Sequence, residues 1–178
     1  MRVIRAIAPA LSLILTFAIG GLALADPAEA TLTARPLAPQ VSIQLSPELA
    51  KKAQDTYGLA EVEAQAERLR ALVAEDLQRM GVMAGGQVTL ILVDVRPSRP
   101  TRQEMSSRPG LSFRSAALGG ASIQGQMTSF DGATTPVAYT WYASDLADSR
   151  RQSVWGDAQW TFERFSHRLS RGQLYALR

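Results

Sequence analysis

The 178-residue sequence has no cysteine and no asparagine, a single histidine and two lysines. Without cysteine there are no disulfide bonds, thiolate metal ligands, cysteine nucleophiles or lipid-bearing cysteine. Without asparagine there is no N-linked glycosylation site. A transition-metal site would have to be built around His167 alone, and so would a histidine-based catalytic site. We therefore expect no catalytic residues of these kinds, no metal and no cofactor.

The N-terminal 25 residues have the three parts of a secretory signal peptide. Arg2 and Arg5 give it a positive start, and the uncharged, mainly apolar stretch that follows ends in Ala-Leu-Ala25 before Asp26. This small-x-small ending predicts cleavage between Ala25 and Asp26, and a second possible site follows Ala30. An uncleaved N-terminal anchor is the alternative, because about 20 apolar residues can span a bilayer.

Cleavage changes the electrostatic character of the protein. Two of the 19 basic residues, Arg2 and Arg5, lie in the signal, which leaves 17 basic residues against 16 acidic ones. A nearly neutral mature protein is not expected to bind nucleic acid, and no stable membrane span remains in it after cleavage. The scarcity of asparagine and lysine, whose codons are rich in A and T, indicates a GC-rich bacterial genome. Export then predicts a periplasmic location, with secretion to the medium as an alternative.

Hydrophobic periodicity predicts one α+β domain over residues 40–178, preceded by a flexible linker at 26–39. We expect a mostly antiparallel sheet of about four strands packed against two or three helices. The predicted strands are 41–45, 87–95, a segment within 111–129 and 136–143, and the predicted helices are 46–57, 59–80 and 157–171. Because strand 87–95 is apolar on both sides, it is expected at the centre of the sheet.

The feature most informative about function is an arginine-rich segment, residues 96–114, which we call the arginine loop. It carries a local charge of +4 because five arginines face one acid, Glu104: Arg96, Arg99, Arg102, Arg108 and Arg114. Guanidinium groups match carboxylates and phosphates, and the nearby Gly119 and Gly120 offer backbone N–H donors. The loop therefore predicts an anion-contacting surface for a phospholipid headgroup, a phosphorylated glycolipid or an acidic envelope protein. The alternative is solvated charge that pairs with the acidic faces of the helices.

Several acidic residues are candidates for a carboxylate-dependent hydrolase that acts on an envelope polymer. They are Asp94, Glu104, Asp131, Asp145, Asp148 and Asp157. Asp131 is explained by a turn and Asp157 by a helix start, and Asp94 is expected to pair with the arginine loop. Their spacing predicts no catalytic pair, so the leading hypothesis is a non-catalytic binding or accessory module of the cell envelope.

Three segments of the chain carry a resemblance to a known group of proteins. They are Arg96-Pro-Ser-Arg-Pro-Thr-Arg with Pro109-Gly-Leu-Ser, then Gly119-Gly-Ala-Ser-Ile-x-Gly125, and finally Trp155-Gly-Asp-Ala with its amphipathic helix. Together, over about residues 40–177, they resemble small exported proteins of proteobacteria that contain domains of unknown function. Some relatives of this type are lipoproteins, from which this chain departs by its lack of cysteine. The resemblance implies export and brings no catalytic residues.

The export hypothesis predicts the N-terminus of the processed protein. We expect protein recovered from the periplasmic fraction to begin at Asp26, or after Ala30 if the second site is used. N-terminal sequencing or intact-mass measurement checks this. A protein that retains Arg2 and Arg5 and sediments with membranes would instead support the uncleaved anchor.

Overall fold

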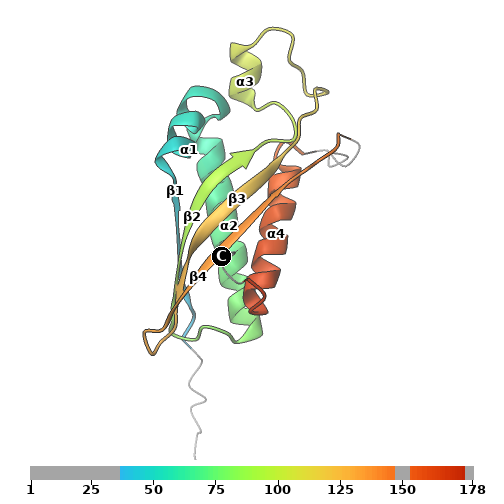
Figure 1. Ribbon diagram of the computed structural model, residues 1–178. Helices are drawn as coiled ribbons and strands as arrows, with labels where there is room; N and C mark the ends of the chain where they lie inside the picture. Colours follow the sequence, from blue (N-terminus) through green and yellow to red (C-terminus); the bar gives the residue numbers. More distant parts are fainter. Residues whose placement is uncertain (1–36, 147–152, 175–178) are drawn as a thin grey trace, which may run out of the picture. The chain divides into compact units, whose positions relative to one another are not determined.

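The computed structural model describes residues 37–146 and 153–174, all of which belong to one compact unit of the chain (Figure 1). The predicted signal peptide, its cleavage site at Ala25 and Asp26, and the predicted linker up to residue 36 lie outside the described residues. So does Asp148. No helix within the described ranges is long and apolar enough to cross a bilayer.

Four strands and a set of helices make up the described chain, in the order β-α-β-α-β-β-α. The strands are β1 (Gln40–Leu45), β2 (Gln87–Arg96), β3 (Gly120–Thr128) and β4 (Thr134–Tyr142). The helices are α1 (Pro47–Lys52) continued by the π-helical turn η1 (Ala53–Tyr57), then α2 (Leu59–Met80), α3 (Arg102–Ser107) and α4 (Gly156–Ser170).

The strands form one sheet in the order β1-β2-β3-β4. β1 and β2 are parallel because the chain returns through α2 between them, whereas β2–β3 and β3–β4 are antiparallel. The predicted α+β domain with a mostly antiparallel four-stranded sheet is therefore confirmed. β2 lies between two neighbours, as its apolar sequence predicts.

Local sequence signals set the helix ends. The Ser46 hydroxyl accepts a hydrogen bond from the Leu49 amide at 3.1 Å, which caps α1, and Pro47 occupies the first turn. α2 runs over the predicted span and ends at Gly81, whose φ of 65° is the left-handed conformation that glycine adopts most easily. α4 ends at Ser170, one residue before the predicted end, and Gly172 follows it with a φ of 66°.

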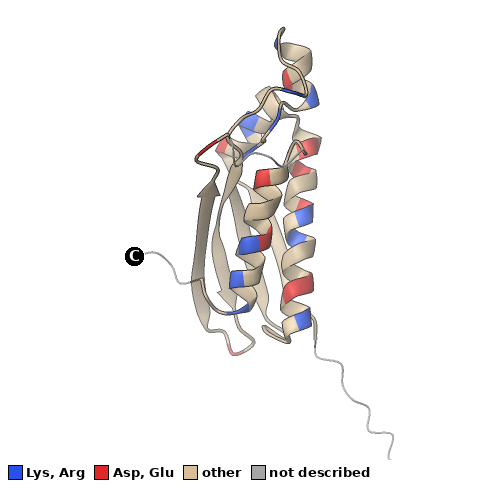
Figure 2. Ribbon diagram, turned by 90° about the vertical axis from the view of Figure 1, so that its right-hand side faces the viewer, with Lys and Arg blue, Asp and Glu red and all other residues tan. Residues whose placement is uncertain are grey.

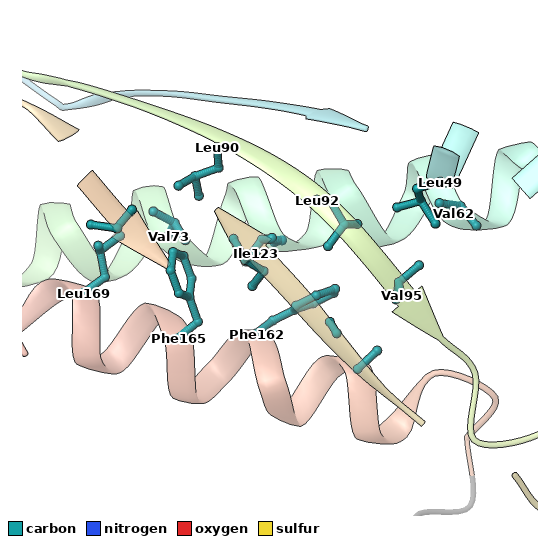
Figure 3. Close-up of a cluster of buried hydrophobic side chains, with 14 of the residues drawn as sticks. Leu49, Val62, Val73, Leu90, Leu92, Val95, Ile123, Phe162, Phe165 and Leu169 are labelled. Atoms are coloured by element: carbon teal, nitrogen blue, oxygen red, sulfur yellow. The ribbon is translucent and has the colours of Figure 1, made fainter. Parts of the chain in front are cut away.

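The hydrophobic core lies between one face of the sheet and the two long helices, α2 and α4, which cover that face side by side (Figure 1). Figure 3 shows Phe162 and Phe165 of α4 directed toward Val73 of α2 and Ile123 of β3. Both phenylalanines are fully buried. Burial of this apolar surface is the main force that holds the layers together.

The second face of the sheet has no helix over it among the described elements. Its side chains are mostly uncharged and polar, and the charged residues in Figure 2 lie mainly on the helices and at the end of the molecule that holds α3. Ile91, in the middle of β2, is 40% exposed on this face. β2 thus carries apolar residues on both faces because it is a central strand of the sheet, although the helices cover only one of these faces.

A β-bulge interrupts β2 just before the arginine loop. The register with β3 shifts between Leu92 and Asp94, which reverses the alternation of side chains. Val95 is therefore buried against the helices, while Asp94 points to the opposite face.

β3 begins at Gly120 and so lies within the segment 111–129 where a strand is predicted, while residues 111–119 belong to the preceding connection. One sequence-based expectation needs correction. The predicted loop after β2 contains a short helix, α3, because Thr101 and Glu104 form a capping box. The Thr101 hydroxyl accepts from the Glu104 amide at 3.2 Å, and the Thr101 amide donates to Glu104 Oε2 at 3.0 Å.

The packing of the core predicts the effect of two phenylalanine substitutions. Phe162→Ala removes a fully buried ring and is expected to lower the free energy of unfolding by about 3–5 kcal/mol. Phe130→Ala, at a position that is 87% exposed, is the matched control and is expected to change it by less than about 0.5 kcal/mol. Urea titration measures both. Equal effects would contradict the proposed layer arrangement.

Candidate anion-binding site

Arg96 is the last residue of β2, and the rest of the arginine loop belongs to the β2–β3 connection, residues 97–119. The start of this connection is hydrogen-bonded to α4. The buried Ser98 hydroxyl donates to Asp157 Oδ2 at 2.8 Å, and the Asp157 amide donates back to that hydroxyl at 3.1 Å. The Ala117 amide donates to the Ser98 carbonyl at 2.9 Å and joins the two ends of the connection. The predicted helix-start residue Asp157 thus also anchors this connection.

Gly119 is required by the same contact. A Cβ at this position would lie 2.5 Å from Ser98 Oγ and 2.9 Å from the Asp157 side chain, so no larger residue fits without movement. Gly120 is equally confined, because a Cβ there would lie 2.3 Å from the Trp141 carbonyl oxygen. Both glycines allow close approach of segments.

The far part of the connection rests on η1 and α2. Gln103 Nε2 of α3 donates to the Gln54 carbonyl at 2.7 Å, and the Arg102 amide lies 3.4 Å from Glu61 Oε1. α3 and the loop therefore stand at the end of the molecule where β2 finishes (Figure 1). The space between the connection and η1 forms the candidate site.

That space is a pocket of about 300 Å³. Three of the five predicted arginines line it: Arg96, Arg99 and Arg108. The other lining residues are one acid, a set of small or apolar residues and one tyrosine: Glu104, Pro97, Pro100, Leu111, Ser115, Ala116, Ala117, Leu118 and Tyr57. The structure thus brings three arginines to one concave surface with an apolar wall.

Arg96 is the arginine of the pocket that is already paired with a carboxylate. Its Nε donates to Asp94 Oδ2 at 2.8 Å, and its guanidinium lies 4.4 Å from the ring centroid of Tyr142. Lys52 Nζ and the Tyr142 hydroxyl also donate to Asp94, at 3.1 and 2.9 Å. The expected pairing of Asp94 with the arginine loop is present, and Lys52 and Tyr142 add partners from elsewhere in the chain.

This network shifts the pKa values of its members. Partial burial alone would raise the pKa of Asp94, but hydrogen bonds from Lys52 and Tyr142, the Lys52 charge and the Arg96 contact hold it below its ordinary value. Burial, followed by the hydrogen bond to Asp94, raises the pKa of Tyr142 well above its ordinary value. Asp94 is therefore ionised at neutral pH and Tyr142 stays a hydrogen-bond donor.

Arg99 and Arg108 are the arginines that remain available for a ligand. Arg99 Nη1 donates to the Phe113 carbonyl at 2.9 Å, which fixes its side chain across the loop. Its Nε is buried and has no hydrogen-bond partner within the described residues. Arg108 is exposed, and neither residue forms an ion pair with a carboxylate in the described ranges.

The remaining predicted site residues lie outside the pocket. Arg102 and Arg114 are exposed and do not line it, and neither do Gly119 and Gly120, which pack against other segments. Conversely, the sequence did not point to Tyr57 or to the proline and leucine wall. The capping box at Thr101 and Glu104 is the signal that could have located α3, and with it one side of the pocket.

The acidic candidates occupy separate structural positions. Glu104 closes the capping box, Asp131 bonds within the β3–β4 turn and Asp157 is buried beside Ser98. Among the described lining residues Glu104 alone is acidic, so the pocket does not present the two carboxylates that glycoside hydrolysis needs. His167 is exposed on α4. No group of three histidine or carboxylate side chains in the described part of the chain could hold a metal ion.

Comparison of the chain with protein-family models, curated proteins and solved structures found no match. Function is therefore inferred from the site and the sequence alone.

The Asp94 network predicts a pH-dependent contribution to stability. Asp94→Asn is expected to lower the free energy of unfolding by about 1–3 kcal/mol at pH 7, because two cations lose their charged partner. Because the folded-state pKa of Asp94 is lowered, this contribution is complete above the unfolded-state pKa of about 4 and disappears as pH falls through the folded-state value.

Denaturant titrations from pH 7 to pH 2 on wild type and Asp94→Asn measure this difference. Glu63→Gln, on the exposed face of α2, is the control for loss of a solvent-facing carboxylate and is expected to have an effect below about 0.5 kcal/mol. A wild-type minus Asp94→Asn difference that stays constant down to pH 2 would contradict the role assigned to this carboxylate.

Proposed function

We propose that this protein is an exported, non-catalytic binding module of the bacterial cell envelope. It holds the anionic group of an envelope component in the pocket lined by Arg96, Arg99 and Arg108. The observation that carries the proposal is that three arginines, from a segment with a local charge of +4, line one pocket of about 300 Å³. Planar guanidinium forks bind carboxylates and phosphates with two parallel hydrogen bonds.

The position of the pocket supports a binding role. The loop is tied to α4 by Ser98 and Asp157 and braced on η1 by Gln103, so its arginines are placed by the folded domain. Preorganised donors lose less entropy when a ligand binds. The signal-like N-terminus supports an envelope location, with the periplasm as the proposed compartment. The hydrolase alternative has no carboxylate pair to support it in this pocket.

A charge-matched pair of double variants tests the proposal. Arg99→Ser with Arg108→Ser removes two pocket arginines, and Arg102→Ser with Arg114→Ser removes two arginines from the same loop outside the pocket. Co-sedimentation with phosphatidylglycerol vesicles at 0.15 M salt, against phosphatidylcholine vesicles, measures binding. We expect the pocket variant to bind at least about tenfold more weakly than its control, given the strength of charge-assisted hydrogen bonds.

Non-specific attraction gives a different result. It contributes about 1 kcal/mol for each basic residue near an anionic surface and would weaken both double variants alike. Equal weakening would therefore contradict the pocket. A wild-type protein that does not bind the anionic vesicles would contradict a lipid headgroup as the envelope component.

A further inference from the structure

We infer that the arginine pocket is specific for an anionic amphiphile, a ligand with a negatively charged head next to a short apolar body. This inference rests on the proposed function and names the class of ligand for the same pocket. The class includes fatty acids, whose head is a carboxylate, and phosphodiester lipids such as phosphatidylglycerol. Their shared chemistry is a single anionic head attached to hydrocarbon.

The charges at the pocket favour a negatively charged ligand. Asp94 is shared between Arg96 and Lys52, at 2.8 and 3.1 Å, so one positive charge of this group stays uncompensated. Arg99 and Arg108 have no carboxylate partner in the described residues, and the pocket lining holds one acid, Glu104. Four cations, the three lining arginines and Lys52, against the two carboxylates of Asp94 and Glu104 leave a net charge of about +2, which attracts an anionic head.

Arg99 and Arg108 are the side chains placed to hold the anionic head. The bond of Arg99 to the Phe113 carbonyl fixes its side chain across the loop. Its Nε is buried and closed to a ligand oxygen in this conformation, so a ligand would contact the solvent-facing part of this half-buried side chain. Arg108, which directly follows α3 in the chain, is exposed and lines the same pocket, so it can contact the same head.

The remaining wall of the pocket is suited to hydrocarbon. Pro97 and Pro100 are buried, Leu111 is half-buried, and Leu118 keeps 42% of its surface exposed. Proline also lacks an N–H group, so this wall offers a ligand few backbone donors. An exposed leucine next to two unpaired arginines indicates an amphipathic ligand, because inorganic anions gain nothing from apolar contact.

The size of the pocket limits how much of the ligand enters. A volume of about 300 Å³ is at the lower end of the range for small-molecule sites. It accommodates a head and the first few carbons of a chain, and the rest of a longer chain would stay outside. Each buried methylene is expected to raise affinity roughly fourfold.

Isothermal titration calorimetry on the purified protein tests the inference with four probes used below their micelle concentrations. Octanoate and acetate share a head and differ in the chain, dihexanoyl-phosphatidylglycerol carries a phosphodiester head, and octyl glucoside has a chain without charge. We expect octanoate or dihexanoyl-phosphatidylglycerol to bind at least about tenfold more tightly than acetate, as two or more buried methylenes require. The tighter of the two identifies the source of the ligand.

Two pairs of variants connect this binding to the pocket. Arg99→Ser with Arg108→Ser is expected to weaken the charged amphiphile at least tenfold, and Arg102→Ser with Arg114→Ser less than twofold. Leu118→Gln, in the pocket wall, is expected to weaken it several-fold and leave acetate unchanged. Phe113→Gln is the control for loss of an exposed apolar side chain, because Phe113 is 63% exposed and does not line the pocket. If circular dichroism shows that Leu118→Gln is not folded, Leu111→Gln, also in the pocket wall, is used in its place.

The outcomes separate this inference from the proposed function. If acetate binds as tightly as octanoate and both depend on Arg99 and Arg108, the pocket binds anions without apolar selection; the inference is then wrong and the proposed function stands. If octyl glucoside binds as tightly as the charged amphiphiles, the charge requirement is wrong. If none of the four probes binds, the inference and the anion-binding function both fail.

Discussion

The contact between Ser98 and Asp157 is the constraint on which the candidate site depends. It attaches the connection that follows β2 to the first turn of α4, and α4 in turn packs its phenylalanines into the core. Gly119 closes against the same pair, so the start and the end of the connection are held at one point. A long segment rich in proline and arginine is thereby given a fixed base, and its side chains converge on a pocket.

Asp94 determines which arginines in this pocket remain free to bind. The bulge in β2 turns the Asp94 carboxylate away from the core. On that side of the sheet it accepts hydrogen bonds from Lys52, Arg96 and the Tyr142 hydroxyl. One carboxylate thus pairs with two cations at the base of the loop and offsets one of their two positive charges, whereas Arg99 and Arg108 have no carboxylate partner in the described residues. The local charge of +4 in the sequence therefore overstates what an anion would meet.

The sequence predicted the fold better than the site. α2 has long apolar periodicity with glycine at both ends, and β2 contains the apolar run 90–93, so local patterns were sufficient to place both. The sequence also predicted the pairing of Asp94 with the arginine loop and identified the arginines. It did not show that Arg102 and Arg114 point elsewhere or that Tyr57 joins the pocket, because those facts depend on how α3 folds onto η1, far away in the chain.

The most direct measurement of the central claim is an NMR titration that follows the Nε–Hε signals of the loop arginines as octanoate is added. The account predicts saturable shifts for Arg99 and Arg108, with a smaller shift for Arg96 because it stays bonded to Asp94. The signals of Arg102 and Arg114 should remain in place, since neither lines the pocket. Equal, non-saturating shifts of all five arginines would contradict it and would show a solvated basic loop without a binding site.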